Sequence, residues 1–340
     1  MSNTSLHVTT RTPGRRRCGL FVGGLLTIMM INACDGSAPS VARTPKAIFI
    51  IVDGIPADVL EKTDTPHMDD IAGDDGYTRS YVGGEVGGPT ESPTVSAVGY
   101  NSLITGTWAN KHNVYDNDIR EPDYRYWDIF RIAKAHDASL QTAIFSTWLE
   151  NRTLLVGDGL DAAGGKKLDY HFDGFEHDTE RFPHDLLRTY IRNIDELVSN
   201  ETARYVEEYG PDLSWVYLEF TDDVGHAFGD SPQQTEALKI MDGNVGTIWS
   251  AVRKRQEAHN EDWLIVVTTD HGRDPDTGKS HGGQSDRERT TWIVTNSRKL
   301  NDRFANLPAV VDILPSIASH LGLEMPQEIR EQLDGQSFID

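Results

Sequence analysis

The chain alternates between short apolar runs and longer segments with helical periodicity. The run Lys46–Val52 is almost wholly apolar and ends at Asp53-Gly54; similar runs lie at 214–220 and 263–269, and weaker ones at 141–146 and 291–295. Helical patterns cover 125–136, 185–209, 232–258 and 310–322. Unbroken apolar runs are typical of strands buried on both faces. Strands that alternate with helices therefore predict an α/β fold, with a central, mostly parallel sheet and helices on both faces.

The first 34 residues have a different pattern. Arg11 and Arg15–Arg17 precede the apolar stretch Gly19–Ile31, which leads into Asn32-Ala33-Cys34. A basic start followed by an apolar stretch too short for a membrane span is typical of a signal peptide. We predict a lipoprotein-type signal peptide at 1–33, a lipidated Cys34, a tether at 34–45 and a folded domain at 46–340. An ordinary secretory signal or an uncleaved anchor is the alternative.

The net charge and the cysteine content limit which partners and which cellular compartment are expected for this protein. The 340 residues include 53 Asp and Glu against 32 Lys and Arg, which gives a formal net charge of −21. Such a chain repels polyanions, so we expect no nucleic-acid duplex as a partner. Both cysteines, Cys18 and Cys34, lie in the N-terminal segment, so the folded domain has neither a disulfide nor a cysteine metal ligand. An exported bacterial lipoprotein, held to a membrane in the periplasm or at the cell surface, is the expectation.

Acidic and histidine residues gather where the predicted strands end. In a parallel sheet the carboxyl ends of the strands meet at one crevice, where ligands bind. The residues that follow the three main strands are Asp53, Asp222, Asp223, His226, Asp270, His271 and His281. Each alone has a simpler interpretation as a turn or cap, and Asp223 could replace Asp222. Together they predict a hydrolytic metal site, with zinc favoured over manganese or iron because the ligands are carboxylates and imidazoles.

A hydroxyl lies at a second informative position. Ser96 follows Pro93-Thr94-Val95 at the predicted start of a helix that runs to Thr105-Gly106. A serine there has its oxygen near the positive end of the helix dipole, which favours an alkoxide and an anionic phosphoryl group. A simple capping serine is the alternative on the local sequence alone.

The order of these motifs resembles the alkaline phosphatase superfamily, and most closely its nucleotide pyrophosphatase/phosphodiesterase branch. The matching motifs, over residues 46–325, are Asp53-Gly54, Thr65–Ala72, Pro93–Ser96, Tyr100–Gly106, His112, Asp116-Asn117, Asp222-x-x-x-His226, Asp270-His271-Gly272 and His281. The resemblance implies an alkaline-phosphatase-like catalytic domain over 46–340, with a loop insertion near 150–182.

The resemblance also implies roles for individual residues. Ser96 would be the nucleophile and contact the metals, and Asn117 would donate to a phosphoryl oxygen. Two divalent ions, most readily Zn²⁺, would be bound by two sets of residues. Asp53, Asp270 and His271 would bind the ion that activates Ser96, and Asp222, His226 and His281 would bind the ion at the leaving group.

This sequence departs from the branch at several points. It has Ser96 where Thr is common, Ala97–Tyr100 where Phe-Pro-Asn-His is common, and Phe220-Thr221 in place of Glu-Pro before the Asp-x-x-x-His motif. His281 follows Asp270-His271-Gly272 without the long segment often present. These departures leave the chemistry intact but affect the expected substrate.

We expect the enzyme to hydrolyse small-molecule phosphate esters through a phosphoseryl intermediate. A phosphotransferase is disfavoured because no long hydrophobic segment follows Cys34, and a sulfatase because Ser96-Ala97-Val98-Gly99-Tyr100 lacks the modification motif. A non-catalytic binding lipoprotein would not need the full ligand set.

Diesters are preferred over monoesters in this interpretation, with a phosphomonoesterase as the alternative. A diester needs an apolar surface for its organic arm, whereas a monoester needs extra cations for its additional charge. The candidate aromatics are Trp108, Tyr115 and Trp148, and the candidate cations are Lys111, Arg152, Lys166 and Lys167. Arg287 and Arg289 fit a solvated loop better than a substrate contact.

Overall fold

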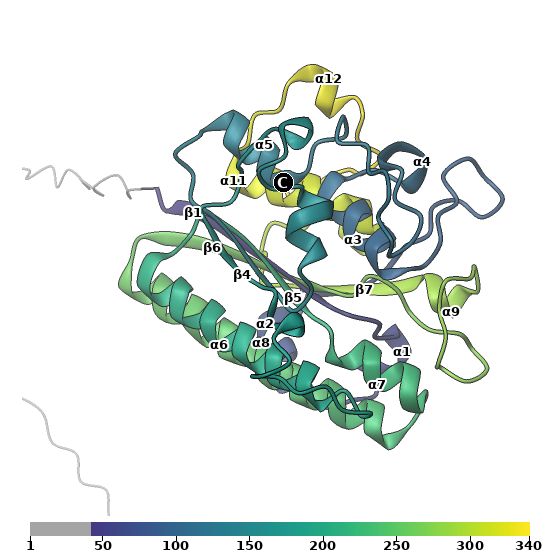
Figure 1. Ribbon diagram of the computed structural model, residues 1–340. Helices are drawn as coiled ribbons and strands as arrows, with labels where there is room; N and C mark the ends of the chain where they lie inside the picture. The colour runs from purple at the N-terminus through teal and green to yellow at the C-terminus, as the bar shows by residue number, and fades with distance from the viewer. Residues whose placement is uncertain (1–41) are drawn as a thin grey trace, which may run out of the picture. The chain divides into compact units, whose positions relative to one another are not determined.

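A seven-stranded sheet forms the centre of the computed structural model, which describes residues 42–340 (Figure 1). Its order is β2-β7-β6-β1-β5-β3-β4. The strands are β1 (Thr44–Val52), β2 (Tyr77–Tyr81), β3 (Thr142–Ser146), β4 (Tyr170–Phe172), β5 (Leu213–Leu218), β6 (Glu261–Thr268) and β7 (Thr290–Thr295). Only β7 runs against its neighbours, so the predicted mostly parallel α/β sheet is confirmed.

The central strand β1 is apolar on both faces because both faces are covered. Ala47, Phe49 and Ile51 belong to one buried cluster, and Ile48 and Ile50 belong to another. This alternation follows from the two-residue side-chain period of a strand. Two layers of helices therefore pack on the sheet, one on each face (Figure 1).

The two helical layers contain different parts of the chain. One consists of α3 (Ser96–Thr105), α4 (Ala109–His112), α5 (Ile129–His136), α11 (Ile313–Leu321) and α12 (Gln327–Arg330). The other consists of α1 (Ala57–Leu60), α2 (Pro66–Ala72), α6 (Thr189–Tyr209), α7 (Phe220–Phe228) and α8 (Pro232–Ala258). The short helices α9 (Asp286–Arg289) and α10 (Asp302–Ala305) flank β7. The four long helical patterns in the sequence correspond to α5, α6, α8 and α11, the last preceded by a 3₁₀ turn at Val310–Asp312.

Several boundaries differ from the sequence predictions. The run 214–220 continues as a strand only to Leu218, and α7 begins at Phe220. The helix predicted from 125 begins at Ile129 because the Asp128 carboxylate caps the backbone N–H groups of Phe130 and Arg131. The edge strands β2 and β4 were missed, since one mixes exposed polar residues with aromatics and the other has three residues.

The segment predicted as an insertion is only partly irregular. It contains a π-helical turn at Asn151–Val156, short 3₁₀ turns at Asp161–Ala163 and Phe175–His177, and strand β4. Between residues 42 and 340, no helix is both long and apolar enough to span a membrane. The predicted signal peptide at 1–33, Cys34 and most of the tether at 34–45 lie outside the described residues.

Candidate metal centre and nucleophile

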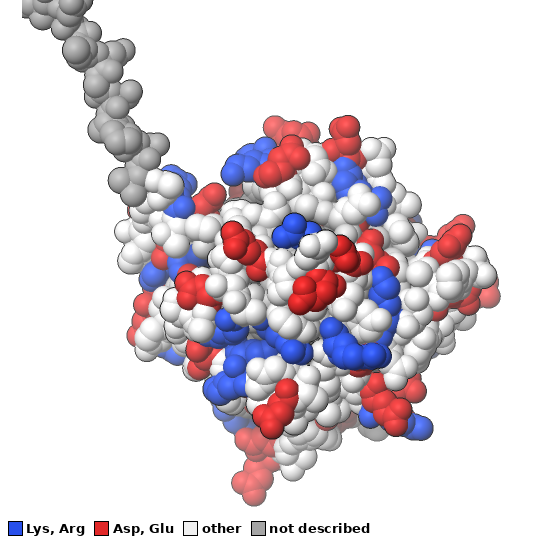
Figure 2. Space-filling model, turned by 90° about the horizontal axis from the view of Figure 1, so that it is seen from above, with Lys and Arg blue, Asp and Glu red and all other residues white. Residues whose placement is uncertain are grey.

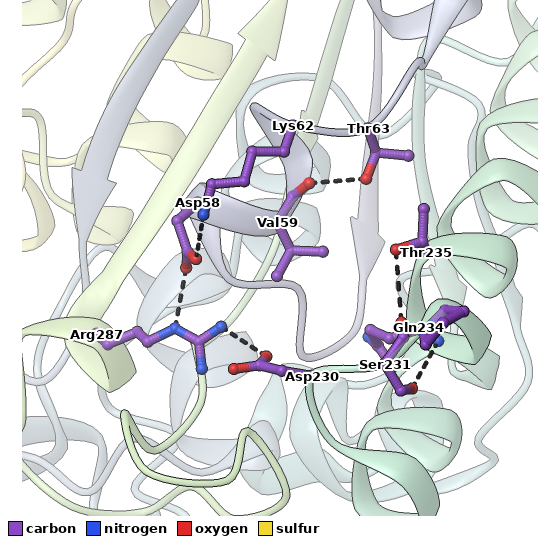
Figure 3. A pocket seen from close by; sticks show the side chains of 10 residues that line it. Asp58, Val59, Lys62, Thr63, Asp230, Ser231, Gln234, Thr235 and Arg287 are labelled. Atoms are coloured by element: carbon purple, nitrogen blue, oxygen red, sulfur yellow. Dashed lines mark hydrogen bonds and ion pairs between the residues drawn. The ribbon is translucent and has the colours of Figure 1, made fainter.

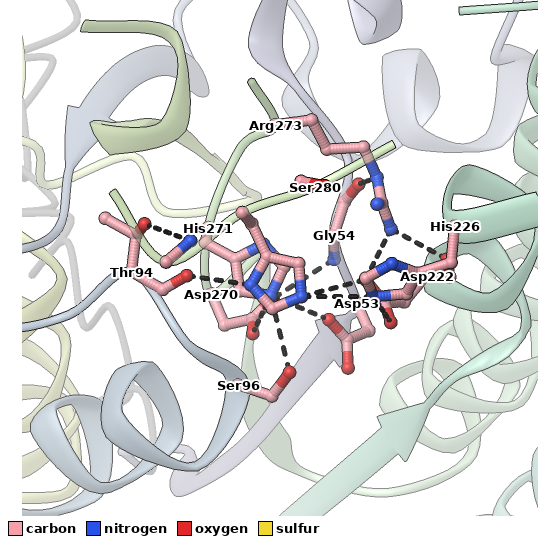
Figure 4. A network of polar contacts seen from close by, with 12 residues as sticks. Asp53, Gly54, Thr94, Ser96, Asp222, His226, Asp270, His271, Arg273 and Ser280 are labelled. Atoms are coloured by element: carbon pink, nitrogen blue, oxygen red, sulfur yellow. Dashed lines mark hydrogen bonds and ion pairs between the residues drawn. The ribbon is translucent and has the colours of Figure 1, made fainter. Parts of the chain in front are cut away.

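Three neighbouring strands deliver the predicted ligands to one edge of the sheet. Asp53 follows β1, Asp270 and His271 follow β6, and Asp222 and His226 lie on α7 directly after β5. His281 comes from the loop between β6 and α9. The six side chains form two groups, and these are the same two sets of three that the sequence resemblance implied. Figure 4 shows five of them, Asp53, Asp222, His226, Asp270 and His271, close to Ser96.

The first group, Asp53, Asp270 and His271, is fully buried. His271 Nε2 lies 3.2 Å from Asp270 Oδ2 and 3.5 Å from Asp53 Oδ1. Neither of these carboxylate oxygens has a hydrogen-bond partner among residues 42–340. His271 Nδ1 lies 2.9 Å from the Gly272 carbonyl oxygen and must donate to it, so a neutral His271 turns the lone pair of Nε2 toward the two oxygens. Three electron-pair donors thus face one point.

The second group is Asp222, His226 and His281. His226 Nε2 lies 3.2 Å from Asp222 Oδ2 and 3.1 Å from His281 Nε2. His281 Nδ1 lies 2.9 Å from the Thr94 carbonyl oxygen and donates to it, which leaves Nε2 directed at the group. The imidazole of His226 is partly exposed, so this group lies closer to solvent than the first.

The two groups and Ser96 lie next to one another. The rings of His271 and His281 stack with centroids 3.8 Å apart and planes at 14°. Ser96, the first residue of α3, places Oγ 3.3 Å from His271 Nε2. Figure 4 shows the hydroxyl pointing from the helix end toward the His271 ring.

Burial and mutual repulsion dominate the electrostatics of the first group. Burial, followed by the charges of Asp270 and Asp222, raises the pKa of Asp53 well above its usual range. Burial also raises the pKa of Asp270 to about 7 and lowers the pKa of His271. Burial alone would raise the pKa of Asp222. The hydrogen bond from His226 and the charge of Arg273 outweigh burial, so the pKa is lowered. The first group therefore brings two carboxyl groups together without a cation of its own, and a bound cation would favour their ionised forms.

Arg273 is a site residue that the sequence analysis missed. Its side chain is 1% exposed and donates to the Asp222 carboxylate, to the Asp222 backbone oxygen at 2.7 Å and to the Gly54 carbonyl at 3.0 Å. It lies against α7 at Gly225, where a Cβ atom would be 2.1 Å from the guanidinium carbon. Its position three residues after Asp270 was the signal in the sequence. A buried arginine needs a partner, and here Asp222 supplies it.

Two tyrosines, also missed, hold Asp53 in place. Tyr100 and Tyr217 both donate their hydroxyls to Asp53 Oδ2, the latter at 2.7 Å, and both are buried. The opposite oxygen, Oδ1, is the one that faces His271. The carboxylate is thus fixed through Oδ2, and its Oδ1 remains directed at His271 and the proposed metal position. Tyr100 lies one helical turn after Ser96, a spacing from which a shared site could have been predicted.

A pocket of about 230 Å³ opens beside Ser96. Its lining is formed by Asp53, Ser96, Tyr100, Asn117, Trp148, Tyr217, Glu219 and Asp222. Asn117 Oδ1 accepts the Ala97 backbone N–H at 3.0 Å, which orients the amide so that its NH₂ group is available as a donor. Two predicted substrate-contacting residues, Asn117 and Trp148, therefore share this pocket with the nucleophile.

The other candidate residues lie elsewhere. The four predicted cations pair with acidic residues away from the pocket: Lys111 with Asp334, Arg152 with Asp173, Lys166 with Asp158, and Lys167 with Asp128. Trp108 stacks on Tyr81, Tyr115 is exposed, and Asp223 pairs with Arg188. On the face shown in Figure 2, acidic and basic side chains are interspersed.

Arg287 belongs to a different cleft (Figure 3). It donates to Asp58 at 2.9 Å and to Asp230 at 2.7 Å, and so joins α1 to the segment after α7. Arg289 donates to Gln284 and to the Gly84 carbonyl. Both arginines are engaged in holding loops together, and neither lines the pocket beside Ser96.

Sequence comparison identifies a family. The family model "Type I phosphodiesterase / nucleotide pyrophosphatase" matches residues 47–282, which is more than half of the chain. Bis(5'-adenosyl)-triphosphatase enpp4 of Xenopus laevis is 23% identical over 257 residues, covering 71% of this chain and 50% of that protein. GPI ethanolamine phosphate transferase 3 of Eremothecium gossypii is 32% identical over 149 residues, covering 39% of this chain and 13% of that protein. The chain thus spans at most about half the length of these relatives.

Solved structures agree on the fold. Murine ectonucleotide pyrophosphatase/phosphodiesterase 5, in complex with AMP, has a TM-score of 0.56 at 14% identity and covers 83% of this chain and 96% of that chain. The phosphonate monoester hydrolase of Agrobacterium radiobacter has a TM-score of 0.58 at 15% identity, over 86% of this chain and 76% of that chain. At such low identity the likeness extends to the fold, which is alkaline-phosphatase-like.

Proposed function

This chain belongs to the type I phosphodiesterase/nucleotide pyrophosphatase family of hydrolases, and we propose that it cleaves phosphodiesters or nucleotide pyrophosphates with two divalent metal ions and Ser96 as nucleophile. The observation that carries the proposal is the pair of three-residue groups beside Ser96. A buried carboxylate oxygen without a hydrogen bond is costly, and Asp53 Oδ1 and Asp270 Oδ2 are two such atoms in one group.

The ligand atoms of the two groups are suited to two zinc ions. Each group offers one ligand atom from each of three residues within 4.8 Å of one another, and every donor is a carboxylate oxygen or an imidazole nitrogen. The outer nitrogens of His271 and His281 are fixed by the carbonyls of Gly272 and Thr94, the arrangement usual for metal-binding histidines. We assign Asp53, Asp270 and His271 to the ion that activates Ser96, and Asp222, His226 and His281 to the ion at the leaving group.

The protein's own groups then define the reaction. Two bound ions would supply charge neutralisation at the attacking and leaving oxygens of an in-line displacement. Ser96 Oγ loses its proton and forms a bond to phosphorus at the N-terminal end of α3, where the helix dipole favours negative charge. The bond from phosphorus to the leaving oxygen breaks, and that oxygen takes up a proton and departs as an alcohol or phosphate. The Asn117 amide donates to a non-bridging phosphoryl oxygen. The phosphoseryl ester formed on Ser96 is then hydrolysed, which restores the hydroxyl.

The pocket favours diesters over monoesters. No Lys or Arg of the described chain lines it, so it offers no extra cation for the second negative charge of a monoester. It does offer Trp148, whose indole packs edge-to-face near Tyr100 with ring centroids 6.1 Å apart. One relative's name, bis(5'-adenosyl)-triphosphatase, describes cleavage of a substituted phosphate, in line with this preference.

The test compares matched substrates that share one leaving group. We expect the zinc-loaded protein to hydrolyse a p-nitrophenyl phosphodiester with higher kcat/KM than p-nitrophenyl phosphate or p-nitrophenyl sulfate. Trp148→Ala should lower diester turnover selectively, whereas Tyr115→Ala, outside the pocket, should have little effect. A clear monoester preference would assign a phosphomonoesterase instead, and preferential sulfate release would assign a sulfatase.

We also propose that the mature protein is exported and held to a membrane by lipid on Cys34. Its basis is the arginine-rich start, the apolar stretch Gly19–Ile31 and the sequence Asn32-Ala33-Cys34.

A further inference from the structure

The pocket beside Ser96 has a chemical character that narrows the substrate class further. We propose that it takes the organic arm of the diester and that this arm is a small cationic alcohol, such as a substituted aminoethanol, recognised by Trp148, Tyr217 and Glu219. The inference rests on the proposed phosphodiesterase function, since it assigns the arm that a phosphodiester would place in this pocket.

The lining is aromatic and acidic. Tyr100, Trp148 and Tyr217 supply aromatic rings, and Glu219 supplies a carboxylate that belongs to neither metal-type group. Aromatic rings attract cations through their negative faces, and a carboxylate at the same pocket adds a direct charge partner. A neutral or anionic arm would gain less from this combination of groups.

Carboxyl groups outnumber basic groups at this wall of the pocket. The Arg188 guanidinium is shared between Glu219 Oε1 and Asp223 Oδ2, at 2.7 Å from each. A third carboxyl, Asp195, lies directly beneath and accepts the backbone N–H groups of Glu219 and Phe220. One guanidinium thus contacts two of three neighbouring carboxyl groups, and burial raises the pKa of both Asp195 and Glu219. A ligand cation beside Glu219 would favour the charged form of its carboxyl group.

The tryptophan is held in a fixed position. Its backbone N–H donates to Ser146 Oγ at 3.1 Å, and Ser146 Oγ donates to its carbonyl at 2.7 Å. The indole packs against the larger buried cluster, which contains Tyr100 and Tyr217. A preorganised ring loses little entropy when it contacts a ligand, so it suits recognition of a compact group.

The volume of the pocket favours a small organic arm over a nucleoside. The pocket has about 230 Å³, below the range of roughly 300–1,000 Å³ usual for sites that enclose drug-sized ligands. The phosphoryl group must share this volume beside Ser96 and Asn117. A group with few non-hydrogen atoms fits the remaining space, whereas a nucleoside would project into solvent.

The experiment uses three p-nitrophenyl diesters that differ only in the second arm: choline, its uncharged isostere 3,3-dimethylbutanol, and thymidine. With the zinc-loaded protein, we expect kcat/KM for the choline ester to exceed that for the dimethylbutyl ester by at least about tenfold, since both arms have the same shape and only one is charged. Glu219→Gln should remove most of this ratio, and Glu207→Gln, at a carboxylate that pairs with Lys254 instead, should leave it unchanged.

A second measurement needs no variant. Tetramethylammonium should inhibit hydrolysis of the choline ester competitively, and neopentyl alcohol, which is similar in size but uncharged, should inhibit much less. Equal kcat/KM for the choline and dimethylbutyl esters would overturn the cationic arm and leave the phosphodiesterase function standing. A preference for the thymidine ester would assign the pocket to a nucleoside. Hydrolysis of monoesters but of none of the three diesters would overturn the proposed function itself.

Discussion

His281 Nδ1 lies 2.9 Å from the carbonyl oxygen of Thr94, two residues before Ser96. The Thr94 hydroxyl extends this contact, since it donates to the Gly283 carbonyl at 2.9 Å and accepts the Gly282 N–H at 2.9 Å. The loop that carries a proposed metal ligand is therefore attached directly to the segment that leads into the nucleophile. Movement of either one changes the distance between Ser96 and the second group.

Thr94→Val should loosen this attachment. The variant keeps the shape of the side chain but removes its hydrogen bonds to the half-buried Gly282 N–H and the exposed Gly283 carbonyl, at a cost of about 0.5–1.5 kcal/mol in the free energy of unfolding. We expect kcat to fall roughly tenfold as well. Urea denaturation and steady-state kinetics measure the two effects. Thr94→Ser, which retains the hydroxyl, should recover most of both, and wild-type behaviour of Thr94→Val would contradict the link.

Ser96→Ala should separate chemistry from metal binding. Because the hydroxyl is proposed to attack phosphorus, turnover should fall by orders of magnitude while zinc content changes little. Asp270→Ala or His271→Ala should lose bound zinc together with activity, since each removes a proposed ligand. Zinc per chain by elemental analysis, alongside initial rates, distinguishes the two classes. Near-normal rates in metal-reconstituted Ser96→Ala would rule out this nucleophile.

The sequence was sufficient to predict the fold class and to select six candidate metal ligands that the fold brings together. Buried parallel strands read as continuous apolar runs, so β1, β5 and β6 could be recognised, and in such a sheet their carboxyl ends converge. The convergence of Asp53, Asp270 and His271 on one sheet edge therefore follows from the sequence alone. The edge strand β2 lacks such a run, because three of its five residues are polar and most of the strand is exposed or only half-buried.

Contacts made by distant side chains could not be predicted. The pairing of Arg152 with Asp173 depends on how the segment after β3 folds back, which no local pattern encodes. The same holds for Arg273, whose partners Gly54 and Asp222 come from two other strand ends. Tyr217 resembles any core aromatic in a strand until the fold places its hydroxyl on Asp53.

Asp195 should make stability depend on pH. Burial raises its pKa to about 7, from an ordinary value of 3.8, although Thr147 and two backbone N–H groups donate to it. The folded protein then holds a proton that the unfolded chain releases above about pH 4. The stabilisation is complete below that value and is lost as pH rises to about 7.

The effect of Asp195 appears when the stabilities of Asp195→Asn and wild type are compared at two pH values. Asp195→Asn removes this titration, so the free energy of unfolding of the variant, relative to wild type, should rise between pH 4.5 and pH 8 by at least about 1 kcal/mol, since one pKa unit corresponds to ~1.4 kcal/mol. Urea denaturation of both proteins in EDTA at the two pH values measures it. A relative stability that stays constant or falls over this interval would show that Asp195 titrates normally.

Cys34→Ser should release the protein from the membrane. If Cys34 carries lipid, its replacement removes the anchor while the folded domain, which begins after the tether, is unchanged. Fractionation of cells that express each form should find wild type with membranes and the variant in the soluble exported fraction. Mass spectrometry of the wild-type N-terminus is the control, and a soluble wild type that begins elsewhere would refute the anchor.

Arg273 should determine how tightly the second group, Asp222, His226 and His281, binds zinc. It is the buried cation that balances Asp222, and it also fixes Gly54, next to Asp53, so it touches the backbone beside both groups. Arg273→Met removes the charge and leaves Asp222 buried against an apolar side chain, which for a broken buried ion pair costs about 3–5 kcal/mol of stability. We expect affinity for the second zinc ion to fall by roughly 10–100-fold, the effect usual for residues that orient metal ligands.

Arg273→Lys should retain part of that affinity, because it keeps the charge but loses the branched set of donors. Gly225→Ala provides an independent route to the same result, since its methyl group would meet the guanidinium carbon at 2.1 Å and displace the arginine without changing its charge. Chelator competition on each purified protein measures the two zinc affinities separately from activity. If Arg273→Met and Gly225→Ala both bind two zinc ions as tightly as wild type, Asp222 does not depend on this arginine and the assignment fails.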